Sequence, residues 1–141
     1  MREIRLWLGL ALAAGVALGA LGNRSLSAQD PLKAGTILGR TELAGAKGLE
    51  AILVLREVPA GAESGKHTQS GNELVYIAEG SVTLEVQGKG PVTVKQGETF
   101  QTAAGEVHNV KNASSTAPVK ALAFYVAKKG TGLEGLSVPA K

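Results

Sequence analysis

Short apolar segments that alternate with turns are the feature of this chain that most restricts its fold. Residues 51–58 (AILVLREV) are apolar almost throughout, as expected of a strand buried on both faces. In residues 82–87 (VTLEVQ), Val82, Leu84 and Val86 share one face, and polar residues occupy the other. Further segments of this kind lie at residues 73–79, 91–95, 99–101, 107–111 and 119–127.

Glycine and proline separate these segments. Turn residues stand at positions 59–61, 80–81, 88–90 and 96–98. No segment after residue 28 shows a sustained helical period with capping residues. About eight short strands, with turns roughly every eight to twelve residues, predict an all-β fold of the sandwich, barrel or jelly-roll type.

The segments group into one domain with flanking regions. We expect residues 50–127 to form the barrel. Residues 29–49 are less regular and rich in Gly, Ala and Leu, with a possible edge strand at residues 36–41. Residues 128–141 are predicted to be a C-terminal tail and a candidate for disorder.

Residues 1–28 have the layout of a secretory signal peptide. Arg2 and Arg5 form a positive start, an uncharged Leu/Ala/Gly-rich run covers residues 6–22, and small residues follow. Cleavage after Ser27 or after Ala28 would give a periplasmic or secreted protein. The alternative is an uncleaved membrane anchor, although the apolar run is at the lower length limit for a spanning helix.

The charge of the chain gives no sign of nucleic-acid binding. The whole chain carries +3, but residues 1–28 hold three arginines and one glutamate, so the remainder carries 12 basic and 11 acidic side chains. A net charge of +1 is no electrostatic footprint for nucleic acid. Because the chain has no cysteine, an exported domain must hold by burial and hydrogen bonding, with metal binding or dimerisation as further means.

The two histidines of the chain lie in segments that also carry turn glycines. His67 and Gln69 are two positions apart on an extended segment, so their side chains leave the same face. The turn at residues 70–72 lets the chain fold back, and Glu73 can then point toward the same place. His108 must come from a distant segment. Two imidazoles, one carboxylate and one amide oxygen would surround a single divalent metal ion inside a barrel.

The spacing of these residues resembles the motifs of the cupin superfamily, specifically its small single-domain members. The first motif is G-x5-H-x-H-x3,4-E-x6-G. This chain matches it with Gly61, His67, Glu73 and Gly80, and has Gln69 in place of the second histidine.

The second cupin motif, G-x5-P-x-G-x2-H-x3-N, has a similar match. Gly97, Gly105, His108 and Asn112 stand at its fixed positions, and Ala103 replaces the proline. The resemblance covers roughly residues 50–127. It implies a double-stranded β-helix, that is, a jelly-roll barrel, with a metal held by His67, Gln69, Glu73 and His108.

Gln69 leaves three interpretations open. A glutamine supplies a harder, weaker and uncharged oxygen donor, so metal affinity should fall relative to a histidine ligand. If Gln69 points away, His67, Glu73 and His108 remain as a two-histidine, one-carboxylate triad like that of non-haem iron(II) oxygenases. Alternatively, Gln69 orients a bound water or a substrate without binding the metal itself.

Other residues are assigned to the barrel interior or to its core. Val75 and Ile77 share a face with Glu73, and Val110 shares a face with His108, so we expect these three to line the interior. Three aromatic residues are assigned to core packing rather than to substrate contact, namely Tyr76, Phe100 and Phe124.

The resemblance implies a mononuclear enzyme that uses one iron, manganese, nickel, copper or zinc ion on a small molecule. Its reaction would be dioxygenase-like, hence an oxidoreductase, or that of a lyase or isomerase, with Glu73 as the group that accepts a proton. The alternatives are a non-catalytic periplasmic module that binds or senses a metal or small ligand, and a metal-free barrel. The small size, the exposed edge strands and the resemblance all suggest a homodimer.

Overall fold

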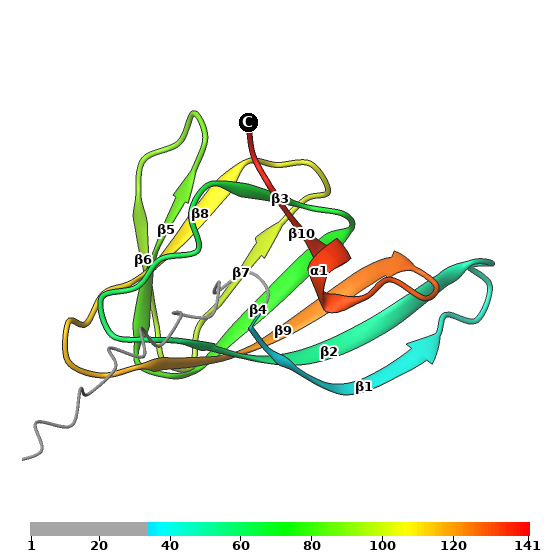
Figure 1. The fold of residues 1–141 in the computed structure, drawn as a ribbon, viewed down its shortest axis with the longest axis horizontal. Helices are drawn as coiled ribbons and strands as arrows, with labels where there is room; N and C mark the ends of the chain where they lie inside the picture. Colours follow the sequence, from blue (N-terminus) through cyan, green and yellow to red (C-terminus); the bar gives the residue numbers. More distant parts are fainter. Residues whose placement is uncertain (1–33) are drawn as a thin grey trace, which may run out of the picture.

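The computed structural model describes residues 34–141, which form two antiparallel β-sheets packed face to face (Figure 1). Sheet A has the strand order β1-β2-β9-β4-β7, with bounds Thr36–Glu42, Leu49–Val58, Val119–Lys128, Asn72–Glu79 and Thr99–Thr102. Sheet B has the order β10-β3-β8-β5-β6, with bounds Ser137–Pro139, His67–Gln69, His108–Asn112, Ser81–Val86 and Val92–Lys95. The all-β, jelly-roll prediction is confirmed.

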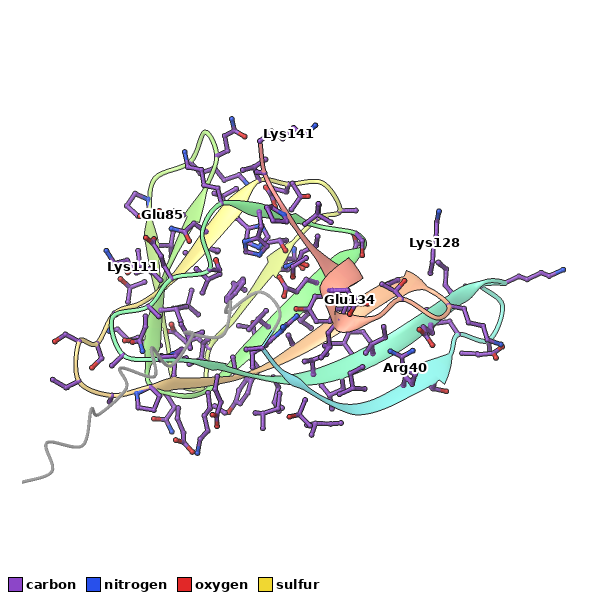
Figure 2. All side chains as sticks on the ribbon, in the orientation of Figure 1. Arg40, Glu85, Lys111, Lys128, Glu134 and Lys141 are labelled. Atoms are coloured by element: carbon purple, nitrogen blue, oxygen red, sulfur yellow. The ribbon has the colours of Figure 1, made fainter. Side chains whose placement is uncertain are left out.

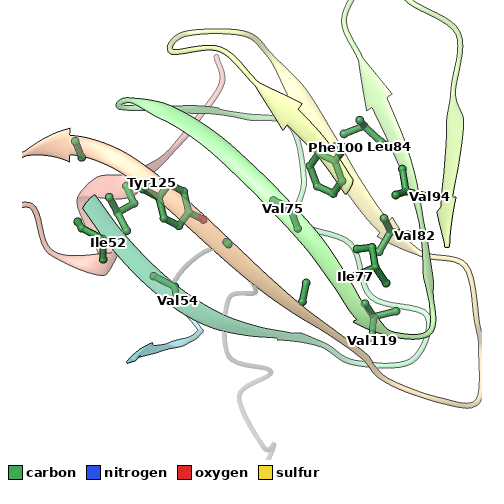
Figure 3. Close-up of a cluster of buried hydrophobic side chains, with 14 residues drawn as sticks. Ile52, Val54, Val75, Ile77, Val82, Leu84, Val94, Phe100, Val119 and Tyr125 are labelled. Atoms are coloured by element: carbon green, nitrogen blue, oxygen red, sulfur yellow. The ribbon is translucent and has the colours of Figure 1, made fainter. Parts of the chain in front are cut away.

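The core lies between the two sheets, where inward-facing Val, Ile, Leu and aromatic side chains meet (Figure 3). Ile52 and Ile77 from sheet A and Val82 from sheet B are almost fully buried. Val75 and Ile77 face inward as predicted, and Val110 packs against the core from β8. Burial of such a contiguous apolar set is the main favourable term in folding a domain without disulfides.

The sequence predicts that strand β2 is buried on both faces, but in the structure only one of its faces is buried throughout. Its even-numbered residues from Glu50 to Arg56 are buried, whereas Leu53 and Glu57 are exposed. The reason is that no further layer of the described chain covers the outer face of sheet A. Strand β1 lies at the edge of this sheet, where the sequence predicts an edge strand.

Tyr76 and Phe124 also differ from their assignment to the core. Both point to the outer face of sheet A and are exposed, because the strand alternation gives the inward places to their neighbours. Phe124 lies opposite Leu53 on β2 and opposite Leu74 on β4. Leu53, Phe124, Leu74 and Tyr76 are between 36% and 46% exposed. Phe100, in contrast, is buried as predicted.

The C-terminal residues are ordered parts of the barrel, which corrects the prediction of a tail. Leu133–Leu136 form a short helix, α1, and Ser137–Pro139 form β10, which pairs with β3. Leu136 is fully buried in the core, and its carbonyl accepts a hydrogen bond from the amide of Ser70. A four-residue helix and a three-residue strand are too short to produce a period in the sequence, so tertiary contacts decide their structure.

The predicted turn glycines have the backbone conformation that favours glycine. Gly61, Gly80, Gly97 and Gly105 all have φ between +68° and +85°. The charged side chains of Glu85 and Lys111 project from the outside of sheet B (Figure 2). The predicted signal peptide lies outside the described residues. No helix in residues 34–141 is long and apolar enough to cross a membrane.

Candidate metal centre

The four predicted ligands come together between the two sheets. His67 and Gln69 lie on β3, Glu73 on β4 and His108 on β8. All four side chains are buried and face the space between the sheets. His67 is the register partner of His108, and their ring centroids are 4.2 Å apart. The role of these four residues as ligands stays a prediction.

Both histidines have their tautomer set by a backbone carbonyl. The Nδ1 atom of His67 donates to the carbonyl of Gly65 at 2.9 Å, and that of His108 donates to the carbonyl of Glu106 at 2.9 Å. In a neutral imidazole the other nitrogen is then an acceptor. Each ring therefore presents the lone pair of its Nε2 atom, which is the orientation that a metal ligand requires.

Hydrogen bonds of the Glu106 side chain hold the turn that precedes His108. The Glu106 carboxylate accepts hydrogen bonds from Lys89 Nζ at 2.7 Å and from the Ala103 amide at 3.3 Å. The Lys89 hydrogen bond, helped by that of Ala103, lowers the pKa of Glu106 below its usual value. These contacts fix the turn whose Glu106 carbonyl orients His108.

The amide of Gln69 lies between His67 and Glu73. Its Nε2 atom is 3.1 Å from Glu73 Oε2, to which it donates, and 3.2 Å from His67 Nε2. Its Oε1 atom accepts a hydrogen bond from the hydroxyl of Ser137 at 3.0 Å. The amide thus donates to the histidine and the carboxylate instead of offering them an oxygen.

Glu73 and His108 are close but are not hydrogen bonded. Glu73 Oε2 accepts hydrogen bonds from Gln69 and from the hydroxyl of Thr102 at 3.1 Å. His108 Nε2 lies 3.7 Å from the same oxygen. This nitrogen is the one buried side-chain N or O atom of residues 34–141 without a hydrogen-bond partner. An unpartnered buried acceptor is costly, and a bound cation would satisfy it.

The chemistry of the donor set fits a divalent transition metal, but the distances between the side chains in this structure do not. Two imidazole nitrogens and a carboxylate are ligands for such ions, and the lone pair of His108 has no other partner. Yet in the described part of the chain no three His, Cys, Asp or Glu groups stand close enough to hold a metal. The amide nitrogen of Gln69 separates His67 from Glu73 and accounts for this spacing.

Tyr125 and Arg56 extend the polar site and were not found from the sequence. Arg56 Nη2 donates to the Tyr125 hydroxyl at 3.3 Å, and Arg56 Nη1 donates to the carbonyl of Ala34 at 2.6 Å. Burial, followed by the negative charge of Glu73, raises the pKa of Tyr125 well above its usual value. Both residues face inward by strand alternation, but no motif marks them as polar exceptions in a core strand.

A small cavity of about 60 Å³ adjoins these residues. Apolar side chains of valine, isoleucine, phenylalanine and alanine form part of its lining, and the polar part consists of Arg56, Ser64, His67, Gln69, Glu73, Tyr125 and Ser137. This space exceeds the volume of about 15 Å³ that a cavity needs to hold a water molecule. A wider cleft of about 960 Å³ lies beside β1 and the loop after β2, and none of the four predicted ligands lines it.

Asn112, the last residue of the second motif, has a structural role. Its Nδ2 atom donates to the carbonyls of Val58, Pro59 and Ala117 at 2.9–3.1 Å. Its Oδ1 atom accepts from the amide of Ser114 at 2.8 Å. Asn112 therefore joins the end of β2 to the loop between β8 and β9, and it is not a candidate ligand.

Residues 54–125 match the family model described as the cupin domain. The chain therefore belongs to the cupin family, as the spacing of the two motifs predicts. No curated protein matches the chain.

Solved structures share the fold. A Klebsiella pneumoniae protein with a double-stranded β-helix domain is 16% identical with a TM-score of 0.58, over 77% of this chain and 80% of that one. The DMSP lyase DddQ from Ruegeria pomeroyi is 21% identical with a TM-score of 0.55, over 76% of this chain and 51% of the lyase. A cupin domain from Bordetella pertussis is 24% identical with a TM-score of 0.50, over 66% of this chain and 91% of that one.

Proposed function

We propose that this protein is an exported cupin that binds one divalent transition metal ion through His67, Gln69, Glu73 and His108 and acts on a small molecule. The observation that carries this proposal is the unpartnered Nε2 atom of His108, buried beside Glu73 and opposite His67. Iron, manganese, nickel, copper and zinc all suit this donor set. When bound, such an ion supplies Lewis acidity or, as iron or manganese, oxygen activation.

Backbone and side-chain groups of the protein have separate roles at this site. The carbonyls of Gly65 and Glu106 hold the two rings with Nε2 toward the site. The small cavity beside His67 and Glu73 favours a small molecule as the substrate. Glu73 is the proposed proton acceptor, and the Thr102 hydroxyl fixes the position of its carboxylate.

The test is the metal content of the purified full chain by elemental mass spectrometry. We expect about one transition metal ion per chain, and its loss in His67→Ala and in Glu73→Gln. Glu79→Gln is the matched control, because Glu79 is an exposed residue on the same strand, paired with Lys120. A parent protein without metal after reconstitution, or metal retained in both site variants, would refute the metal site.

A second candidate function is non-catalytic binding of a metal or small ligand. The observation that favours it is that Glu73 Oε2 already accepts two hydrogen bonds, so the proposed base is engaged. Water-proton relaxation of the Mn²⁺-loaded chain separates the two candidates. An enzyme requires a coordination position open to exchanging water, which enhances relaxation, whereas a closed binding site gives no enhancement.

Export is proposed from the sequence of residues 1–28. Expression of the full chain in a bacterium, followed by fractionation and N-terminal sequencing, tests it. We expect protein in the periplasm or medium that begins at residue 28 or 29. A chain that stays in the membrane with residue 1 intact would indicate the uncleaved anchor instead.

A homodimer is proposed from the outer face of sheet A. Leu53, Phe124 and Leu74 form a row across three adjacent strands there, and Tyr76 lies beside them. Contiguous exposed apolar side chains of this kind are typical of protein–protein contacts. Light scattering should give two copies for the parent and one for Phe124→Asp. Val92→Asp, an exposed position in sheet B, is the control and should stay dimeric.

A further inference from the structure

We propose that the side-chain amide of Gln69 reverses its orientation when a metal ion binds, and that the Ser137 hydroxyl makes both orientations stable. Ser137 is thus a positioning residue that acts through Gln69. This inference rests on the proposed metal site and specifies how that site changes between its free and bound states.

The metal-free orientation is complete in its hydrogen bonds. The two N–H groups of Gln69 face Glu73 Oε2 and His67 Nε2, and its oxygen accepts the hydroxyl of Ser137. Both Gln69 and Ser137 are buried, so bulk solvent does not compete for these contacts. The amide nitrogen holds apart two groups that would otherwise face each other as acceptors.

The opposite orientation is unfavourable without a cation. Rotation of the amide would bring its oxygen toward Glu73 Oε2 and His67 Nε2, so that three acceptors would meet in a buried space. A divalent cation reverses this preference, because the same three acceptors become ligands together with His108 Nε2. The amide orientation and cation binding are therefore coupled.

Ser137 can serve both orientations because a hydroxyl donates and accepts. It donates to Gln69 Oε1 in the structure and can accept from Gln69 Nε2 after the rotation. Its position is fixed by the pairing of β10 with β3, in which Ser137 is the register partner of Gln69. The buried Leu136 anchors this strand in the core.

Loss of the Ser137 hydroxyl should destabilise the metal-bound site more than the metal-free site, and metal affinity should therefore fall. Without the hydroxyl, the free site lacks a partner for one carbonyl oxygen. The bound site lacks partners for the amide N–H groups, which are tolerated less well when buried. Mutation of a residue that hydrogen bonds to a metal ligand typically lowers metal affinity by about 10–100-fold. We expect a loss in this range for Ser137→Ala.

A double-mutant cycle with Zn²⁺ as the probe tests the coupling, with the affinity of the full chain measured against a chelating dye. In Gln69→Glu the side chain ends in two oxygens and has no amide to rotate. Ser137→Ala should therefore weaken Zn²⁺ binding in the parent but change it less than about threefold in the Gln69→Glu chain. An equal loss in both chains, or no loss in the parent, would refute the inference while the metal site stands.

The rotation can also be tested on the parent protein, where no substitution affects the stability of the fold. The side-chain NH₂ signals of Gln69, assigned by their absence in Gln69→Glu, should show nuclear Overhauser contacts to the His67 ring before Zn²⁺ is added. At saturation with Zn²⁺, the contacts should move to the β-protons of Ser137. Unchanged contacts at saturation would overturn the rotation alone, whereas no Zn²⁺ binding by the parent would overturn the metal site as well.

Discussion

His67 lies directly opposite His108 across strands β3 and β8, with 4.2 Å between the ring centroids. These are the two histidines of the chain, and each has its Nδ1 proton bound to a backbone carbonyl two positions earlier. The backbone therefore sets both tautomers before any ligand is present. An arrangement that holds two Nε2 lone pairs side by side in a buried space is suited to a shared cation.

The turn that joins the two site strands should not tolerate a side chain at Gly71. A Cβ atom there would lie 1.9 Å from the carbonyl oxygen of Val126, so the turn between Gln69 and Glu73 must move. We expect Gly71→Ala to lower the free energy of unfolding by about 3 kcal/mol, measured by urea denaturation. Gly90→Ala is the control, because its Cβ meets nothing within 4 Å, and should be neutral.

Asn112 should contribute to stability and not to metal binding. Asn112→Ala leaves three carbonyls and one amide without their partner, and we expect a loss of about 3 kcal/mol in urea denaturation. Asn72→Ala removes one longer contact to an amide and should cost about 1 kcal/mol or less. Folded Asn112→Ala should bind Zn²⁺ like the parent, and a loss of binding would contradict the assignment.

Tyr125 should stay protonated in alkaline solution beyond the usual range of tyrosine. Burial and the charge of Glu73 raise its pKa, so its contribution to stability is complete below about pH 10 and is lost as pH rises further. The tyrosinate absorbance of the parent minus that of Tyr125→Phe should stay near zero through pH 10 and rise only above it. A difference that develops at or below pH 10 would show that Tyr125 is accessible to water.

The C-terminal segment should be needed for stability. Leu136 is fully buried, and Leu136→Ala should lower the free energy of unfolding by about 2–5 kcal/mol. Val138 is on the same segment but 47% exposed, so Val138→Ala should change stability by about 0.5 kcal/mol or less. Thermal denaturation of both variants checks this, and equal effects would restore the prediction of a loose tail.

Metal should leave the site in acid. Ligation requires neutral imidazoles and an ionised carboxylate, so protons compete with the metal for the same atoms as the pH falls. Dialysis of metal-loaded protein at a series of pH values, followed by elemental mass spectrometry, measures the loss. Full metal content at pH 4 would contradict the assigned ligands.

The sequence predicts the strands and the four site residues because both depend on local spacing. A period of two assigns Val75 and Ile77 to the face of Glu73, and the histidine spacing selects the residues that meet in the barrel. Ser137 could not be found in this way, because the register of β10 against β3 depends on the burial of Leu136. The exposure of Phe124 has the same origin, since an apolar strand does not reveal whether a second layer covers it.

The pairing of Ser137 with Gln69 also orders the events of folding. These residues are 68 positions apart, and the site draws on β3, β4, β8 and β10. Closing a segment of that length loses chain entropy that only later contacts compensate, so pairings between distant strands form slowly. The four proposed ligands lie on β3, β4 and β8, but the hydrogen bond from Ser137 to Gln69 can form only after β10 has paired with β3. In a refolding experiment, the step at which Zn²⁺ binding becomes tight should therefore report the docking of β10 rather than the collapse of the core.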